Sequence, residues 1–464
     1  MSRKTALRNL HQVFVIVLSS YVLFACTLSN KEIETQTSQQ TQPASSTDQQ
    51  QPILDNEAIG KETDEERFYM QMQQVPFLPG DTSHRHIACE MQMQSSDLHK
   101  TSDDIDYSNE GWEKRIPMDV ALLKKTASMG RVLLIDTIYT DAGPAYRYFS
   151  NDTHDELYEP WSSSKIFAYS GALAQMRKKG VGAPGMIGES NVSDMITTIH
   201  SYAPFGTSNS SSNDLATYFA NVAGRDYLTS LFFDAWLGLS NTDVFFRGAY
   251  GPSTFVPESD VWIDERTGKT ASINAYQTAQ DDPGYLAYRC DKCSLTGNKP
   301  MTTLAQAEWL KRLAMHETSP QTAHPFLTIE DVRSLFYGIG NSVGQDNMAG
   351  MTQGISNMLH RALANQIDNR TSTSNVLDDN SDGKWRIFQK IGWGPSETRG
   401  TTENVMLAHV CLPNTDNPER SLQFTIAAQV AVDQSAEANI PIAGLKMQAL
   451  LDAVMALYFN EKAN

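Results

Sequence analysis

The sequence has little cysteine, no run of basic residues and no internal repeat. Five cysteines occur in 464 residues, and the formal net charge is −17. An acidic chain without a basic run is poorly suited to bind nucleic acid or to adhere electrostatically to anionic lipid. The hydrophobic content of 40% is ordinary for a globular protein, and the length allows one large domain or two.

The scarcity of cysteine limits the possible cross-links. Beyond the N-terminal stretch the cysteines are Cys89, Cys290, Cys293 and Cys411, which allow three pairings. We consider a local bridge between Cys290 and Cys293 with a long-range bridge between Cys89 and Cys411. The alternative is a zinc site in which the 290–293 pair is joined by His84 and His86. No second pair of ligands has a recognised zinc spacing, so disulfides are favoured and we expect no metal or cofactor.

The first 26 residues are typical of an export signal. Arg3, Lys4 and Arg8 precede an apolar stretch at 13–23, and Ala25 then stands before Cys26. This ending resembles a bacterial lipoprotein signal, in which the cysteine is lipidated and becomes the new N-terminus. The apolar run is short for a bilayer span. We therefore expect a signal peptide over 1–25 and a lipid anchor that holds the protein in the bacterial envelope, on the periplasmic face and at the outer membrane. An uncleaved anchor helix is the alternative.

Composition divides the rest of the chain into three parts. Residues 26–66 are rich in Gln, Ser, Thr and acidic residues and have almost no aromatic residues, so they predict a disordered tether. Residues 67–111 form an N-terminal extension without a clear pattern. The main domain is predicted over 112–464.

Periodicity within the main domain predicts an α+β fold. We expect a helix at 118–129, strands at 131–139 and 145–149, and then a helical block interrupted by long surface excursions at 239–300. A polar loop at 367–382 leads to strands at 385–390, 405–412 and 422–432 and to a final helix at 443–459. This order predicts an antiparallel five-stranded sheet packed by helices, with an inserted all-helical subdomain.

The strongest chemical signal is Ser162-Ser-Ser-Lys165 at the start of a predicted helix. Residues at i and i+3 share one face of a helix, so the hydroxyl and the amine point the same way. A serine becomes a nucleophile when a nearby base takes its proton, and a buried lysine with a lowered pKa can be that base. By itself the four-residue pattern is a weak signal.

Two further motifs follow in order, at Ser211-Ser-Asn213 and Lys390-Ile-Gly392. With these three motifs the chain resembles the penicillin-recognising serine hydrolases, which include class A β-lactamases and penicillin-binding proteins. The resemblance covers about 112–460, by element order more than by identity. It implies an acyl-enzyme on Ser162 and a β-lactam or a peptidoglycan peptide amide as substrate. An esterase or a silent binding lipoprotein is the alternative.

The resemblance also implies individual roles. Lys165 would take the proton of Ser162, and Ser211 would relay it to the leaving group. Asn213 would hold the substrate amide, and Lys390 would add positive charge. The backbone N–H groups of Ser162 and Trp393, the residue after Gly392, would form the oxyanion hole. Each motif residue is alternatively an ordinary loop or strand residue, and the serines near 209 offer rival positions.

The chain departs from the family pattern at three points, one of which is a longer segment from Asn213 to Lys390 that includes Cys290 and Cys293. Ile391 stands where the family has a hydroxyl residue that helps to bind a substrate carboxylate. Recognition of that carboxylate therefore requires another donor, for which Thr398, Arg399, Thr401 and Thr402 are the candidates. The Glu-x-x-Leu-Asn loop that supplies the deacylating base in class A enzymes is absent between 224 and 301. Glu258, Asp260 and Glu265 lie in that part of the chain, and the sequence does not choose among them. Without a base we expect slow turnover.

Overall fold

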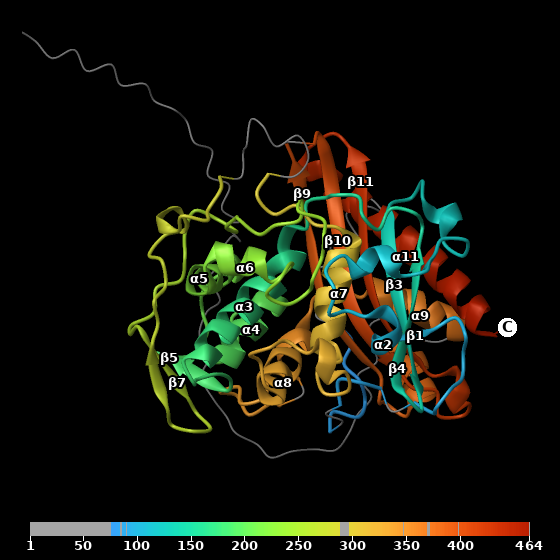
Figure 1. Cartoon of the computed structure of the whole chain (residues 1–464), viewed down its shortest axis with the longest axis horizontal. Coiled ribbons are helices and arrows are strands. Elements are labelled where there is room, and N and C mark those ends of the chain that lie inside the picture. Colours follow the sequence, from blue (N-terminus) through green and yellow to red (C-terminus); the bar gives the residue numbers. More distant parts are fainter. Residues whose placement is uncertain are drawn as a thin grey trace, which may run out of the picture. The chain divides into compact units, whose positions relative to one another are not determined.

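Two sheets organise the part of the chain that the computed structural model describes, which is residues 76–83, 86–89, 91–287, 297–346, 348–368, 372–397 and 399–463. The larger sheet has the order β1-β4-β3-β11-β10-β9 (Figure 1), and β2 pairs with β4. Its strands are β1 (Lys100–Thr101), β2 (Met118–Asp119), β3 (Arg131–Thr140), β4 (Gly143–Ser150), β9 (Arg386–Ser396), β10 (Thr401–Leu412) and β11 (Leu422–Asp433). The smaller sheet has the order β6-β5-β7-β8. It consists of β5 (Gly185–Ile187), β6 (Ser190–Asn191), β7 (Val261–Asp264) and β8 (Thr270–Ser272).

Alternation along the long strands divides the interior into two cores. In β3, Leu133 and Ile135 belong to one core, whereas Val132 and Leu134 belong to the other. Successive side chains of a strand point to opposite faces, so both faces of this sheet are buried. The first core lies between the sheet and the helical insert, and the second lies between the sheet and the C-terminal helices.

The helices cover these two faces as layers. The first face packs against α7 and the insert, and the second packs against α9, α10 and α11 (Figure 1). The α-helices are α2 (Ser102–Ile105), α3 (Lys165–Lys178), α4 (Val192–Ser201), α5 (Ser212–Ala223), α6 (Arg225–Ser230), α7 (Thr303–Ala314), α8 (Ile329–Tyr337), α9 (Met358–Ile367), α10 (Thr373–Ser381) and α11 (Ile440–Ala463). The 3-10 helices are η1 (Trp112–Arg115), η2 (Lys124–Thr126), η3 (Trp161–Ser164), η4 (Ala279–Asp281), η5 (Pro320–Thr322), η6 (Gly350–Gln353), η7 (Pro418–Arg420) and η8 (Glu437–Asn439).

The predicted five antiparallel strands are confirmed as β3, β4, β9, β10 and β11. Three local predictions were wrong. The insert is not all-helical, because β5, β6, β7 and β8 form a small sheet within it. No α-helix forms over 118–129, since residues 118 and 119 pair in parallel with β4 and the helical part of the segment is the short 3-10 helix η2. The polar segment before β9 contains α10, whose Val376 and Leu377 are buried against α9, so packing outweighs the low helix propensity of its Ser, Asn and Asp residues.

The N-terminal extension contributes to the same domain. β1 pairs with β4, and Ile87, Ile105 and Tyr107 belong to the first core. A disulfide joins Cys89 to Cys411, with the two Cα atoms 5.2 Å apart, which confirms the predicted long-range pair.

Several other predictions fall outside the described residues. These concern Cys26, His84, Cys290, Cys293 and Thr398. Within the described ranges, no group of three His, Cys, Asp or Glu side chains could hold a metal ion.

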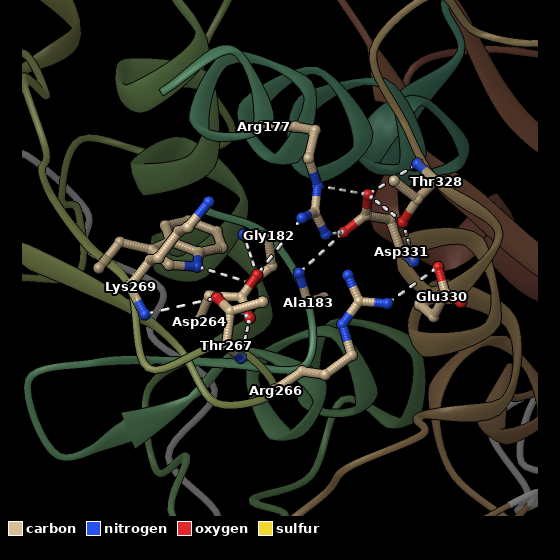
Figure 2. Close-up of polar contacts among 11 residues, drawn as sticks. Arg177, Gly182, Ala183, Asp264, Arg266, Thr267, Lys269, Thr328, Glu330 and Asp331 are labelled. Carbon is tan, nitrogen blue, oxygen red and sulfur yellow. Dashed lines mark hydrogen bonds and ion pairs between the residues drawn. The ribbon is translucent and has the colours of Figure 1, made fainter. Parts of the chain in front are cut away.

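An ion-pair cluster fixes the far end of the helix that begins at Lys165. Arg177, in the last turn of α3, donates to Asp331 Oδ2 at 2.8 Å and to Asp264 Oδ2 at 3.3 Å (Figure 2). The same two carboxylates accept the backbone N–H groups of Ala183 and Gly182, at 2.8 and 3.1 Å. Asp264 and Asp331 are fully buried, and their charges are matched by these donors. The cluster ties α3 to β7 and α8 and so restrains the position of the helix.

Among the described residues, the segment Glu437–Ala463 is long and apolar enough to cross a membrane by length and composition alone. It contains α11, and Met447, Leu451 and Val454 of this helix are fully buried in the second core. In this structure the helix therefore serves as a layer of the domain.

Candidate active site

Ser162 lies in a tight turn at the start of α3. Trp161, which precedes it, has a φ of 49°, in the left-handed region that non-glycine residues rarely adopt. Such backbone conformations cost about 1–3 kcal/mol and persist where the surroundings enforce them, often at functional sites. Here β9 packs directly against the turn. A Cβ atom on Gly392 would lie 2.6 Å from the backbone nitrogen of Ser162, so only glycine permits this approach.

Lys165 is fully buried at the first position of α3. Its Nζ donates to Asn213 Oδ1 at 2.7 Å and to Ser212 Oγ at 2.9 Å. Both acceptors are uncharged, and among the described residues no carboxylate forms an ion pair with this amine. A neutral amine has two N–H donors and one lone pair. With both donors engaged, the lone pair remains available to accept a proton.

The surroundings favour the neutral form of both lysines of the site. Burial lowers the pKa of Lys165 well below its ordinary value, the charge of Lys299 lowers this pKa further, and Asp214 acts in the opposite direction. Burial also lowers the pKa of Lys390, and the charge of Lys165 adds to this shift. Loss of hydration disfavours an ammonium group, and a neighbouring cation strengthens the effect.

Tyr202 connects these groups, although the sequence did not single it out. It follows the last turn of α4, with a φ of 56°, and its hydroxyl accepts a hydrogen bond from Lys390 Nζ at 2.8 Å. Its ring lies 5.0 Å from Lys165 Nζ and 5.7 Å from the ring of Trp393. Burial of the hydroxyl raises the pKa of Tyr202, and a hydrogen bond with the Ser162 side chain opposes the rise. Although 36% of the residue is exposed, these contacts hold its hydroxyl within the group.

The second motif is divided between two tasks. Ser211 is exposed and caps α5, where its hydroxyl accepts the N–H of Asp214 at 3.1 Å. Ser212 is buried, accepts from Lys165 and donates to the carbonyl of Ile199 at 2.9 Å. The structure thus brings Ser212 and Asn213 to Lys165. The relay role of Ser211 stays a prediction, and a side chain in the capping position has its oxygen engaged by the helix.

The third motif lies on the edge strand β9. Phe388 belongs to the first core and Ile391 to the second, so the strand alternation places Lys390 and Gly392 on the face toward Ser162. Ile391 faces the C-terminal helices. The replacement of a hydroxyl residue by isoleucine at this position therefore does not alter the face of β9 that points toward Ser162. Trp393 follows Gly392 and lines a cavity together with Ser162. Its role in an oxyanion hole stays a prediction.

That cavity has a volume of about 520 Å³. Two residues of the sequence motifs, Ser162 and Asn213, line this cavity together with aromatic, amide and ionisable side chains. The remaining lining residues include Glu159, Trp161, Tyr250, Gln280, Tyr285, Asn298 and Lys299. A volume of this size is sufficient for a small organic substrate.

The residues considered as substitutes at the departures from the pattern lie elsewhere. Arg399 pairs with Glu403 at 2.9 Å, and Thr401 donates to the same carboxylate at 3.1 Å. Thr402 donates to the backbone carbonyl of Gln434 at 2.9 Å. None of these three residues lines the cavity around Ser162.

The three carboxylates considered for deacylation are exposed. Glu258, Asp260 and Glu265 lie on the segment around β7 and do not line the cavity that contains Ser162.

Comparison with solved structures gives likenesses at low identity. The TLA-3 extended-spectrum β-lactamase is 10% identical over 74% of this chain and 99% of its own, with a TM-score of 0.40. A β-lactamase from Chitinophaga pinensis is 11% identical over 74% and 99%, with a TM-score of 0.37. PBP-A is 11% identical over 74% and 97%, with a TM-score of 0.36. No protein-family model matches the chain, and no curated protein matches it by sequence. These likenesses carry no argument about chemistry, which rests on the geometry described above.

Proposed function

We propose that the protein is a serine hydrolase that forms an acyl-enzyme on Ser162, with a β-lactam or a peptidoglycan peptide amide as substrate. The observation that carries this proposal is the environment of Lys165. Its amine is buried, its two hydrogen bonds go to neutral oxygens, and its pKa is lowered. Burial and uncharged acceptors favour the neutral amine, which is the form that acts as a general base.

In the first step Ser162 Oγ attacks the carbonyl carbon of the substrate, and the hydroxyl proton passes to the lone pair of Lys165. Asn213 and Ser212 hold the amine in one orientation by accepting its two N–H groups. Negative charge then develops on the carbonyl oxygen. In this mechanism the backbone N–H groups of Ser162 and Trp393 stabilise that charge, and the close approach of Gly392 to the backbone nitrogen of Ser162 supports this role.

Tyr202 supplies the proton for the leaving group in this mechanism. Burial raises its pKa, so its hydroxyl stays protonated at neutral pH and serves as a donor rather than as the initial base. Lys390, hydrogen-bonded to the same hydroxyl, aids return of the proton from Lys165. Tyr202 thus takes the role that the sequence motif suggested for Ser211.

Intact-protein mass spectrometry after exposure to benzylpenicillin tests the proposal. We expect one transient covalent adduct on the wild-type protein, trapped by an acid quench, and none on Ser162→Ala. Hydrolysis of the chromogenic cephalosporin nitrocefin reports turnover in the same experiment. If neither reagent yields an adduct or a product, and a serine-directed phosphonate also fails to label the protein, a catalytically silent binding protein replaces the hydrolase.

An acyl ester is the second candidate substrate. Of the candidate donors that the structure describes, Arg399, Thr401 and Thr402 are engaged in internal contacts, and none of the three lines the cavity around Ser162. Hydrolysis of p-nitrophenyl acetate, lost in Ser162→Ala, together with no penicillin adduct, would select the ester over the β-lactam.

The location we propose is the periplasmic face of a bacterial membrane, through a lipid on Cys26. The lipoprotein-like sequence around residue 26 supports it, and the Cys89–Cys411 disulfide fits an oxidising compartment. Metabolic labelling with a radioactive fatty acid should mark the wild-type protein and not Cys26→Ala. Equal labelling of both proteins would exclude this anchor.

A further inference from the structure

Glu159 is a buried carboxyl in the same cavity as Ser162, and the mechanism above does not use it. It lies three residues before the serine, and only 1% of its surface is exposed. Its Oε2 atom is buried and has no hydrogen-bond partner among the described residues. A carboxylate oxygen without a partner is costly to bury, so its retention beside a reactive serine calls for a functional reason.

The backbone fixes the position of this carboxyl. Tyr158 and Met301 form a two-way backbone pair, with N–O distances of 2.9 and 3.1 Å. This pair holds the segment before Ser162 against the segment that carries Lys299. Both Glu159 and Lys299 consequently line the cavity.

The charged groups around Glu159 oppose one another. Burial raises its pKa, Lys299 lowers it, Glu403 raises it and Arg399 lowers it. All three neighbours have their own partners: Lys299 Nζ donates to Ala249 O at 2.9 Å, and Glu403 pairs with Arg399 at 2.9 Å. Glu159 is left with the proton affinity that a general base needs near neutral pH.

We infer that Glu159 is the general base for deacylation, acting on a water molecule between its carboxylate and the acyl group on Ser162. The inference rests on the proposed acyl-enzyme. Glu159 removes a proton from water, and the water oxygen attacks the acyl carbonyl carbon. The bond between that carbon and Ser162 Oγ then breaks, and Oγ takes up the proton. One water is consumed, the carboxylic acid product leaves, and both side chains return to their starting states.

The other candidate carboxylates lie in different surroundings. The exposed Glu258, Asp260 and Glu265 lie outside the cavity, and Glu403 is occupied by Arg399, Thr401 and Trp161. The sequence led us to look for the deacylating base after Gly224, whereas Glu159 lies on the segment before the nucleophile.

Rapid mixing with nitrocefin and with p-nitrophenyl acetate tests the inference on Glu159→Gln. We expect the wild type to turn over and the variant to show a burst of one equivalent, seen as ring opening of nitrocefin in the acyl-enzyme or as release of p-nitrophenolate from the acetate. The steady-state rate that follows should fall at least 100-fold, and the acyl adduct should accumulate in the intact mass. Hydroxylamine, which attacks an ester without a base, should release that adduct. Glu159→Asp should recover part of the steady-state rate, whereas the exposed control Glu258→Gln should behave as wild type.

The outcomes separate this inference from the proposed function. A burst with an unchanged steady-state rate in Glu159→Gln would overturn the role of Glu159 and leave the acyl-enzyme intact. A stable wild-type adduct without turnover of either reagent would do the same. If the variant lost the burst and the steady state equally, its role would be structural, and thermal unfolding would show the accompanying loss of stability. No reaction of the wild type with either reagent would remove the acyl-enzyme itself.

Discussion

Lys165 and Lys311 are both buried, but their surroundings are opposite. Lys311, on α7, donates to Glu308 Oε1 and to the hydroxyls of Tyr107 and Tyr148, at 2.7, 2.7 and 2.9 Å. Three acceptors match the three N–H groups of an ammonium, and one acceptor carries a negative charge. Lys165 has two neutral acceptors. One site thus stabilises a cation, whereas the other stabilises a free amine.

The comparison separates a structural charge from a reactive group. Burial lowers the pKa of Lys311 to about 8, with Glu308 opposing the effect of burial and the charge of Arg312 adding to it. At Lys165 the neighbouring cation, Lys299, lowers the pKa further. Burial alone therefore does not identify a catalytic lysine, and the number and charge of its acceptors do.

The largest effect is expected for Lys165→Met. Acylation by nitrocefin should slow by about 10³-fold, within the range for loss of a general base. Thermal unfolding should stay unchanged or shift upward, because an amine without a buried carboxylate partner is replaced by an apolar side chain of similar length. Stopped-flow absorbance and calorimetry measure the two quantities. Acylation within tenfold of the wild type would remove Lys165 from the role of base.

Lys311→Met should have the opposite result. Removing one partner of a buried ion pair leaves the other charge exposed to a low dielectric, and we expect a loss of about 3 kcal/mol in the free energy of unfolding. This lies at the lower end of the usual range because Arg312 still contacts Glu308 at 3.0 Å. Urea unfolding measures the loss, and Glu308→Gln in the same chain should restore part of it. A loss below about 1 kcal/mol would refute the assignment as a structural pair.

Tyr202→Phe tests how the site lysines are connected. The ring contact with Trp393 is kept, while the hydroxyl that accepts from Lys390 is lost. We expect acylation to fall by about 10²-fold, the lower end of the range for acid–base groups, with little change in KM. Ser211→Ala is the matched comparison. It should cost about 1 kcal/mol in stability through loss of the α5 cap, without this loss of rate. The reverse pattern would return the relay to Ser211.

The sequence predicted the elements that local patterns determine. Strand alternation identified β3, β9, β10 and β11, and the Ser-x-x-Lys spacing identified Lys165 with its helix. It did not identify Tyr202, because that residue reaches Lys390 through a tertiary contact across 188 positions of the chain. Nor did it identify Glu159, whose importance depends on burial and on the segment that carries Lys299. Nor did the sequence show that Ser212, rather than Ser211, contacts Lys165. That depends on the residue at which α5 begins, because a shift of one residue decides which serine caps the helix.

The smallest predicted effect is on the pH dependence of stability, which should differ between Lys165 and Lys311. A lysine whose folded pKa is lowered binds fewer protons in the folded state than in the unfolded state, so stability rises with pH between the folded pKa and the ordinary value of about 10.4. The slope is about 1.4 kcal/mol per pH unit for each such group.

For Lys311 this window begins near pH 8. For Lys165 the direction is the same, because burial and the charge of Lys299 lower its folded pKa well below the ordinary value, with Asp214 opposing them. Lys165→Met should therefore flatten the rise of stability with pH, whereas Lys311→Met should leave that rise unchanged below pH 8. Acylation should fall tenfold per unit below the folded pKa of Lys165, since the protonated amine cannot accept the serine proton. Urea unfolding at pH 6, 7 and 8 checks the first statement, and nitrocefin burst rates at the same pH values check the second. An identical slope in Lys165→Met and the wild type would mean that this lysine is charged in the folded protein, and the distinction between the two lysines would disappear.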